Sequence, residues 1–398
     1  MTAAEVKAEA TGSALRTGKV ALVRNNFLPW SETFIHDEIR HHERYEVTVF
    51  ARQWRNADRF PGNRVVAVER VPQERRRLAS AWYAAFGRSR RLESALDAGG
   101  FSIVHAHFGH NGLYGLTLAR RAGLPLVVSL HGRDVTILLG RDKYRPTWWH
   151  YLAGYKRLFR EARLFLAASS ELKELIVSAG CPAEKVVVHR LGIDLQALRP
   201  GTPCDGNAEP LVVMVGRFVE KKGHAYGIEA MAAARKAGCA GRLVIVGDGP
   251  LRREYERLVA RLGLEGTVAM PGALSHAEVA RLLAGASVVL APSVVARNLD
   301  RESGLIVAKE AAACGVPVVG TRHGGIPEIV EDGVTGFLVE ERDCRAMGEK
   351  LAALLGDPGL RRSLGRAARA RMEREYDIVE RVRALEGLYD AVIEGRAP

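Results

Sequence analysis

The sequence has few cysteines and no long apolar run, and these absences exclude several classes of protein. Its five cysteines are odd in number and scattered along 398 residues, which argues against a disulfide framework and against a structural zinc site. No apolar run approaches the length that spans a bilayer, and residues 1–18 lack the hydrophobic core of an export signal. We therefore expect a cytoplasmic protein in which residues 1–18 form a disordered tail.

The sequence also lacks a complete dinucleotide-binding motif. Gly247, Asp248 and Gly249 follow an apolar run and begin like the Gly-x-Gly-x-x-Gly fingerprint, but Arg252 stands where the third glycine belongs. This departure excludes NAD as a cofactor.

The chain is basic, yet it lacks the motifs of a nucleic-acid-binding protein. Its formal net charge is +12 and its pI is about 9.7, which raises three partners: nucleic acid, an anionic membrane face and a phosphorylated substrate. A solvated arginine-rich surface explains the same charge. No zinc-finger spacing or aromatic RNA-binding signature accompanies it, so we expect no nucleic-acid partner.

The length and composition predict two globular domains. The chain is too long for one ordinary core, and 47% hydrophobic with 26% charged residues is typical of folded proteins. Alternating strand-like and helix-like segments predict an α/β fold, and a polar stretch rich in proline and glycine at 200–210 is typical of a linker. We therefore expect one domain at 19–199 and a second at 211–375.

Residues 287–328 predict a strand, a loop, a helix and a second strand. The run 287–291 is apolar and β-branched, the residues from Ser303 to Cys314 suit a helix, and Pro317 opens another β-branched run. In such a parallel unit ligands lie where the strand ends and the helix begins, because free backbone N–H groups there favour an anion. Three residues form this candidate anion-binding segment: Ser303, Gly304 and Leu305.

Two acidic residues flank that segment, Glu302 and Glu310. On a helix, eight residues correspond to a rise of about 12 Å and a rotation of roughly 80°. The pair cannot easily form the close carboxylates, roughly 5 Å apart, that a retaining glycosidase needs. We expect the two residues to contact two different parts of one long ligand.

Two cations follow the first strand of the second domain. Arg217 and Lys222 lie in a loop at the carboxyl end of the run 211–215, where they can hold a diphosphate and stabilise the negative charge that builds as it leaves. Lys221 is assigned to the solvated surface.

Two predicted strands of the first domain end in histidines. The run 101–106 ends in His105, His107 and His110, followed by Asn111, and three histidines so close suggest a metal. A strand end before a glycine-rich turn sets no tetrahedral geometry, however, and no nearby cysteine or acid completes a ligand set. We therefore predict no metal site and assign these residues to a polar wall. The run 124–130 delivers His131, which is either a structural histidine or part of a site.

Two further segments of the first domain have two interpretations each. Ser31, Glu32 and Thr33 follow the loop after the first strand, so they either cap a helix or meet an incoming sugar or acceptor. The predicted helix 74–98 combines arginines with Trp82, Tyr83 and Phe86. It either lies on an anionic bilayer or packs its aromatic side chains into the core.

Taken together, these motifs resemble the donor-site signature of retaining glycosyltransferases of the GT-B fold, family four. The resemblance rests on Glu302 and Glu310 with seven residues between them (an EX7E pattern), followed by Ala-Cys-Gly-Val-Pro-Val-Val and Gly-Gly-Ile-Pro-Glu. Gly-Arg-x-x-x-x-Lys-Gly at 216–223 and His-Gly-x-Asp at 131–134 match further family motifs. Pro-Trp-Ser-Glu-Thr-Phe at 29–34 resembles the branch that builds exopolysaccharides such as colanic acid, although the glycine pair of many members is absent.

The resemblance implies two Rossmann-like domains facing a central cleft, with the helix at 376–398 crossing back to the first domain. It implies a nucleotide-sugar donor, with a UDP-sugar favoured and GDP-mannose next. A hexosyl or N-acetylhexosaminyl group would move with retention to a hydroxyl of a polysaccharide, a lipid-linked glycan or a small metabolite. The diphosphate would help to take the acceptor proton. We expect no cofactor and no metal, because the cations and the helix terminus supply positive charge.

The resemblance also gives roles to individual residues. The predicted catalytic residues are Glu302, His131, Arg217 and Lys222. The predicted donor-binding residues are Arg217 and Lys222 on the diphosphate with Ser303, Gly304 and Leu305, Glu302 on the sugar and Glu310 on the ribose. The predicted acceptor-binding residues are Ser31, Glu32, Thr33, His107, Asn111 and Asp134, of which Asp134 would orient the acceptor or its own loop. Two rival functions remain: a phosphorylase or sugar-phosphate synthase, and a non-catalytic nucleotide-sugar-binding subunit.

Overall fold

A computed structural model gives the fold of the chain. The residues that it describes are 18–28, 33–57, 60, 62–70, 73–201 and 209–396. The predicted tail up to residue 17, the candidate residues Ser31 and Glu32, and residues 202–208 of the predicted linker lie outside the described residues.

The chain divides into two compact units, each built from segments that are distant in sequence. The first unit contains the described residues up to Ser129, residues Gly154–Phe165 and the residues from Val382 onward. The second unit contains residues Leu130–Ala153 and Leu166–Arg381. The domain bounds expected from the sequence stay a prediction.

The first sheet has seven strands in the order β5-β3-β1-β6-β7-β8-β9. Its strands are β1 (Gly18–Val23), β3 (Tyr45–Ala51), β5 (Arg64–Ala67), β6 (Ile103–His107), β7 (Leu126–Leu130), β8 (Leu164–Ala167) and β9 (Val186–Val188). The pairs β5-β3, β3-β1, β1-β6 and β6-β7 are parallel. A separate parallel pair joins β2 (Asn26–Phe27) to β4 (Gln53–Trp54). The strand order reverses between β1 and β6, which is the mark of a doubly wound fold.

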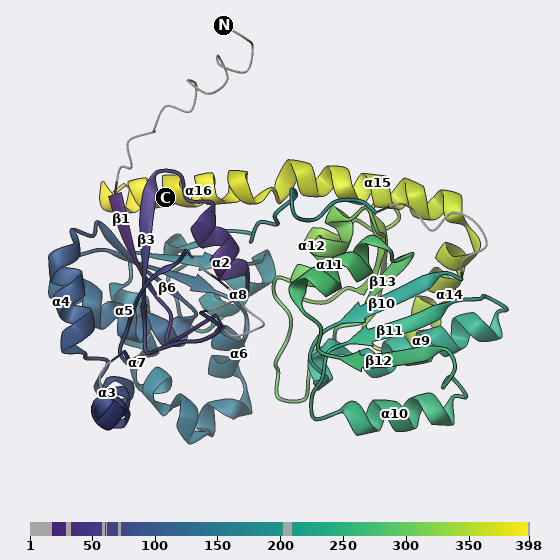
Figure 1. Ribbon diagram of the computed structural model, residues 1–398, viewed down its shortest axis with the longest axis horizontal. Helices are drawn as coiled ribbons and strands as arrows, with labels where there is room; N and C mark the ends of the chain where they lie inside the picture. The colour runs from purple at the N-terminus through teal and green to yellow at the C-terminus, as the bar shows by residue number, and fades with distance from the viewer. Residues whose placement is uncertain are drawn as a thin grey trace, which may run out of the picture. The chain divides into compact units, whose positions relative to one another are not determined.

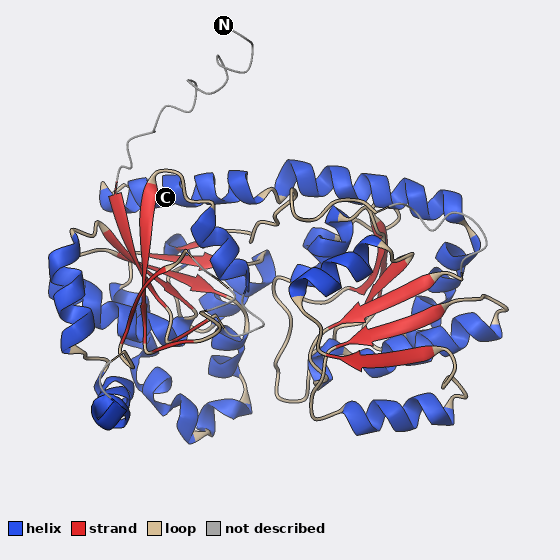
Figure 2. Ribbon diagram, in the orientation of Figure 1, coloured by secondary structure: helices blue, strands red, loops and turns tan. Residues whose placement is uncertain are grey.

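Helices flank these strands in Figures 1 and 2. They are α2 (Thr33–Arg40), α3 (Gln73–Phe86), α4 (Arg90–Gly99), α5 (Gly109–Ala122), α6 (Arg133–Leu139), α7 (Trp149–Glu161) and α8 (Ser170–Ser178). Short 3-10 turns are η1 (Arg141–Tyr144), η2 (Pro146–Trp148) and η3 (Ala183–Lys185). The single helix expected at 74–98 is two helices, because the chain turns at Gly87 with a φ of +67°, a conformation that favours glycine.

The second sheet has six strands in the order β12-β11-β10-β13-β14-β15, and its pairs are parallel. Its strands are β10 (Leu211–Val215), β11 (Arg242–Val246), β12 (Val268–Gly272), β13 (Val288–Ala291), β14 (Val318–Thr321) and β15 (Gly336–Val339). The helices are η4 (Glu220–Lys222), α9 (His224–Lys236), α10 (Arg252–Arg261), α11 (His276–Ala284), α12 (Ile306–Ala313), α13 (Ile326–Ile329), α14 (Cys344–Gly356), α15 (Pro358–Glu375) and α16 (Ile378–Ile393).

The central strands of the second sheet are buried on both faces, which explains why β10 and β13 are apolar throughout. Val213 on β10 packs into a cluster with α11, α12 and α15, whereas its neighbours Val212 and Met214 pack into a cluster with α9, α10 and α14. Successive side chains of a strand point to opposite faces, so each of these strands needs apolar residues at every position. The α/β prediction is confirmed.

The helix expected from Ser303 begins three residues later, at Ile306. The Ser303 hydroxyl donates a hydrogen bond to the His131 carbonyl at 2.7 Å, and Leu305 has a non-helical ψ of 93°. The contact with residue 131 holds this segment as a loop. The estimate of a 12 Å helical rise between Glu302 and Glu310 was therefore wrong for its first part, because residues 302–305 are not helical.

The last helix, α16, packs on the first unit through polar side chains. Glu386 Oε1 accepts hydrogen bonds from the backbone N–H groups of Glu43 and Arg44 at 3.0 and 2.9 Å. The Tyr389 hydroxyl lies 2.7 Å from His105 Nδ1. No helix in the described part of the chain is both long and apolar enough to cross a membrane.

Candidate functional site

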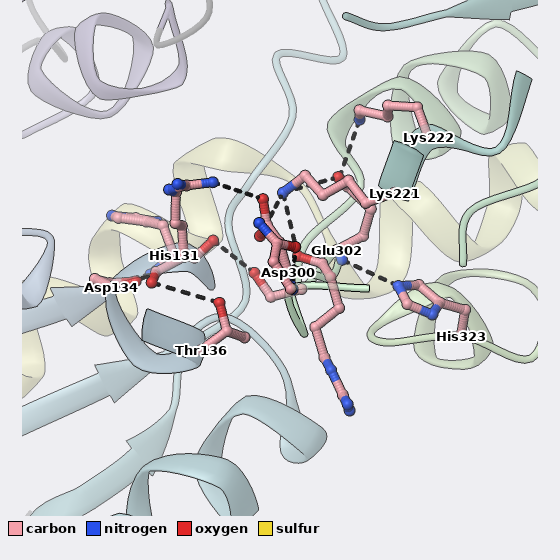
Figure 3. Close-up of polar contacts among 12 residues, drawn as sticks. His131, Asp134, Thr136, Lys221, Lys222, Asp300, Glu302 and His323 are labelled. Carbon is pink, nitrogen blue, oxygen red and sulfur yellow. Dashed lines mark hydrogen bonds and ion pairs between the residues drawn. The ribbon is translucent and has the colours of Figure 1, made fainter. Parts of the chain in front are cut away.

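In the second unit, two lysines that follow β10 contact the carboxylate of Glu302, which lies in the loop after β13. Lys222 Nζ lies 3.0 Å from Glu302 Oε2, and Lys221 Nζ lies 3.2 Å from Glu302 Oε1 (Figure 3). Gly223 follows with a φ of +62°, and a Cβ there would lie 1.8 Å from the Pro292 carbonyl oxygen. Glycine thus lets the backbone of the lysine loop touch the backbone of the loop after β13.

The charge of Glu302 is fixed by this arrangement. Burial alone would raise the pKa of Glu302, but Lys222 and Lys221 outweigh it and hold the pKa well below its usual range. The Glu302 backbone N–H also donates to His323 Nε2 at 3.0 Å, and His323 Nδ1 lies 2.6 Å from Glu341 Oε1. The two lysines therefore keep the carboxylate ionised, and His323 fixes the backbone of the same residue.

The assignment of Lys221 to the solvated surface was wrong. Its side chain is largely buried, and Nζ lies 3.2 Å from Asp300 Oδ1 and donates to the Arg301 carbonyl at 3.2 Å. Burial would lower the pKa of Lys221, but Glu302 and Asp300 raise it above its ordinary value. One signal in the sequence could have indicated this burial. The two adjacent lysines are complemented by two acids, Asp300 and Glu302, which are separated by one residue.

The turn after β7 meets the same loop. Arg133 Nη1 lies 3.0 Å from Asp300 Oδ2, and Asp134 Oδ1 accepts the backbone N–H of His131 at 3.1 Å. Gly132 has a φ of +117°, and a Cβ there would lie 2.8 Å from Ser303 Oγ. The structure thus brings His131 and Asp134 to the loop that carries Glu302 and Ser303 (Figure 3).

The His-Gly-Gly motif packs backbone against backbone on this loop. Gly324 has a φ of +55°, and a Cβ there would lie 2.0 Å from the Glu302 carbonyl oxygen. A Cβ on Gly325 would lie 1.9 Å from the Ser303 carbonyl oxygen. Because these two residues are glycines, the backbone after β14 can pack directly against the backbone of residues 302 and 303. The two glycines of the motif therefore shape the site through their backbone, and its His323 side chain accepts the Glu302 backbone N–H.

The segment 303–305 precedes a helix that has no side-chain cap. Leu305 is the N-cap of α12 and offers no hydrogen-bonding side chain. The first-turn N–H groups of a helix need partners, and together with the helix dipole they favour an anion. Lys222 in the loop after β10 and the first turn of α12 thus both supply positive charge to the loop that carries Glu302.

Arg217 lies in the loop after β10, and Glu310 lies on helix α12. Arg217 is exposed, and among the described residues its side chain makes no hydrogen bond or ion pair. Glu310 is buried on α12, with Oε1 lying 3.7 Å from His276 Nδ1. Of the four residues with the strongest sequence signal, the structure brings Lys222 and Glu302 into direct contact.

Two of the acceptor candidates, His107 and Asn111, belong to a buried polar network in the first unit. Thr33 is the first residue of α2. Asn111 Nδ2 donates to the His107 carbonyl at 2.7 Å, and His107 Nε2 lies 3.1 Å from Glu38 Oε1. An acid from α2 therefore stands beside these histidines, which the local sequence did not reveal.

The residues Glu38, His105 and His107 lie close enough to hold a metal, with potential ligand atoms within 4.8 Å of one another. Both ring nitrogens of His105 already lie in hydrogen bonds, to Tyr389 and Ser129 at 2.7 and 2.8 Å. Two remaining ligands fall short of the three that a protein zinc site usually supplies. The absence of a metal stays a prediction.

Each half of the chain matches a family model of glycosyltransferases. Residues 31–197 match the family model described as Glycosyltransferase Family 4, and residues 206–371 match the model described as Glycosyl transferases group 1. The putative colanic acid biosynthesis glycosyltransferase WcaL of Escherichia coli is 38% identical over 253 residues, which are 63% of this chain and 61% of that protein. The chain thus spans less than two thirds of that relative's length.

A second relative and a solved structure match over longer stretches. The D-inositol 3-phosphate glycosyltransferase 1 of Catenulispora acidiphila is 31% identical over 317 residues, 75% of this chain and 74% of that protein. The structure of Anabaena HepE in complex with UDP and glucose superposes with a TM-score of 0.73 at 21% identity, over 94% of this chain and 100% of that chain. The chain has the GT-B fold and belongs to glycosyltransferase family 4.

Proposed function

We propose that the protein transfers a hexosyl or N-acetylhexosaminyl group from a nucleotide-sugar to a hydroxyl acceptor with retention of anomeric configuration. The observation that carries the proposal is the contact of Lys222 with Glu302 at the start of α12. A cation, an uncapped helix start and an ionised carboxylate lie together, which suits a diphosphate joined to a sugar. Membership in family 4 supports the same chemistry.

Each candidate residue of the second unit has a part in this proposal. Lys222, Arg217 and the N–H groups at the start of α12 bind the diphosphate and stabilise its charge as it leaves. Glu302 accepts hydrogen bonds from hydroxyls of the transferred sugar, and Glu310 accepts them from the ribose. These cations are sufficient in charge, so we propose that no metal takes part.

The transfer step is a substitution on one face of the sugar. The bond from the anomeric carbon to the diphosphate oxygen breaks, and the acceptor oxygen forms its bond on the same face. The acceptor proton passes to the leaving diphosphate, so the reaction needs no carboxylate nucleophile. His131 faces this reaction from its strand end. The hydrogen bond from its N–H to Asp134 supports the role of Asp134 as the residue that orients the turn.

Lys222 must change partners when the donor binds. The ammonium group of Lys222 pairs with Glu302 at 3.0 Å, and a diphosphate offers it a stronger anion. Lys221 stays beside Glu302 Oε1 and Asp300, so it can keep the carboxylate ionised and in place after Lys222 moves. We propose Lys221 as a positioning residue for Glu302.

The donor is proposed to be a UDP-sugar, with GDP-mannose as the next candidate. The HepE structure contains UDP and glucose, and it shares the fold of this chain. The relatives that act in colanic acid and amylovoran biosynthesis support an acceptor in exopolysaccharide assembly, such as a lipid-linked glycan. The candidate acceptor contacts remain Ser31, Glu32, Thr33, His107 and Asn111.

A donor panel tests the proposal. We expect one UDP-sugar to raise the melting temperature of the protein more than the GDP-, ADP- and dTDP-sugars do. Turnover with that donor and an acceptor panel, followed by NMR, should show the retained anomer. The exposed Glu265→Gln serves as a control variant in the same unit. Turnover that requires inorganic phosphate or a sugar phosphate would favour the rival synthase. Donor binding without turnover on any acceptor would favour a binding subunit.

A further inference from the structure

Helix α3 presents an apolar stripe to solvent. Leu78, Trp82 and Phe86 are 76%, 60% and 58% exposed, and their spacing of four residues places them on one side of the helix. The rings of Trp82 and Phe86 lie 4.4 Å apart between centroids. Folded proteins rarely leave large apolar side chains in a contiguous row, so this stripe indicates a surface that meets a partner.

An adjacent side of the same helix is anchored in the first unit. Tyr83 is fully buried, and its ring stacks on that of Tyr114 with centroids 5.0 Å apart. The sequence left open whether the aromatic side chains of this segment face the core. The structure buries Tyr83 alone of the three, whereas Trp82 and Phe86 point away from the core. The stripe therefore is not needed to hold the helix in place.

Arginines border the stripe. A groove of about 850 Å³ is lined by Leu78, Trp82 and Phe86 together with Arg88, Arg90 and Arg91. Arg88 pairs with Glu93 at 3.3 Å, but Arg90 and Arg91 are exposed and have no acidic partner among the described side chains. Apolar side chains beside unpaired cations match the chemistry of a surface that offers hydrocarbon and phosphate together.

We propose that this face of α3 docks on an anionic phospholipid bilayer. Leu78, Trp82 and Phe86 enter the interface between headgroups and acyl chains, and the arginines contact lipid phosphates. Charge selects this occupant over a second copy of the chain, because two copies meeting at this face would bring like charges together. In Figure 1 α3 lies at the edge of the first unit remote from α16, so this side of the unit is not covered by the chain's last helix.

Flotation of the full chain with vesicles tests the proposal. We expect binding to vesicles of phosphatidylcholine with 30% phosphatidylglycerol, weak binding to pure phosphatidylcholine, and loss of binding as salt rises. The variant Leu78→Ser/Trp82→Ser/Phe86→Ser should lose at least about tenfold in vesicle affinity, and Arg90→Glu/Arg91→Glu about as much. Far-UV spectra and melting temperatures should match those of the unaltered protein.

A matched control uses exposed aromatics elsewhere. Tyr144 and Trp149 are 72% and 62% exposed, and Tyr144→Ser/Trp149→Ser should leave vesicle binding unchanged. Absence of binding by the unaltered chain to anionic vesicles overturns the proposal. An equal loss with the control variant overturns it as well. A fall in solution mass for the stripe variant, with vesicle binding unchanged, would instead identify a second copy as the occupant.

Discussion

Two buried carboxylates, Glu386 in the first unit and Glu302 in the second, are held by different kinds of partner. Glu386 contacts the side chains of His42 and Arg44, but it also accepts hydrogen bonds from three backbone N–H groups, which the fold fixes and no ligand can displace. Glu302 is held by the ammonium groups of two lysines, which sit on flexible stems and can turn to another anion. The first arrangement stabilises the fold, and the second leaves its cations available to a ligand.

The largest expected effect is on catalysis, from Glu302→Gln. This change keeps the shape of the side chain but removes the charge that faces the sugar. We expect kcat with the preferred UDP-sugar to fall by a factor of roughly 10² to 10³, as for the loss of one stabilising group in other enzymes. Glu265→Gln should keep full activity, and equal activity of both variants would remove Glu302 from the mechanism.

The second effect is on stability, from Glu386→Gln. Loss of the charge weakens several hydrogen bonds at a buried site, so we expect the free energy of unfolding to fall by about 2–3 kcal/mol. Burial raises the pKa of Glu386, but His42 and backbone N–H groups outweigh it and lower the pKa. The stabilisation is therefore present above the unfolded pKa of about 4 and is lost as pH falls below it.

Urea unfolding at pH 7 and pH 3.5 measures this difference. Glu394→Gln, just beyond the same helix, is the control and should unfold like the unaltered protein. The folded fraction of Glu386→Gln should keep its kcat. If Glu386→Gln lost most of its kcat without losing stability, Glu386 would have a catalytic role and would not differ from Glu302 in the way proposed.

A smaller effect is expected from Lys221→Met, which separates the two lysines. Without Lys221, Asp300 and Glu302 repel each other once Lys222 has turned to the donor. We expect kcat to fall about tenfold, with KM changed less, because donor affinity depends on Lys222. Lys221→Arg should restore part of the rate, and the exposed Lys236→Met should have no effect. An increase in KM alone would mean that Lys221 binds the donor directly.

The last effect appears only as a change of stability with pH and concerns a third buried charge, Lys309 on α12. Its Nζ donates to the Leu191 carbonyl at 3.0 Å, and burial, aided by Arg190, lowers its pKa to about 7. Between pH 7 and about 10 the unfolded chain holds a proton that the folded chain lacks, so stability rises with pH by up to about 1.4 kcal/mol per unit. Lys309→Met should remove this rise. Unfolding curves of both proteins at pH 6, 7.5 and 9 test it, and parallel pH profiles would contradict it.

The fold could be predicted from the sequence because its signals are local. The apolar runs at 211–215, 243–246 and 287–291 match three strands of the second sheet, whose central strands are buried on both faces. Glycines marked the sharp turns. The start of α12 was misplaced because the contact of Ser303 with His131, 172 residues away, decides where that helix begins.

The residues of the candidate site could be predicted from the sequence only where they belong to a family motif. Lys222 and Glu302, which family motifs named, are in contact although they lie 80 residues apart in the chain. Lys221 was missed because its burial depends on Asp300, which lies in another loop. Glu38 was missed because α2 and β6 are far apart in sequence, so no local pattern pairs it with His107. The roles of these residues in transfer stay predictions.

Titration of UDP into three forms of the protein tests the central claim most directly. Lys222→Met should lose UDP affinity by at least about tenfold, because it removes the cation that binds the diphosphate. Glu302→Gln should bind UDP as tightly as the unaltered protein or more tightly, because Lys222 no longer has to leave a carboxylate, while its glycosyl transfer is lost. UDP binding by Lys222→Met that equals that of the unaltered protein would contradict the account.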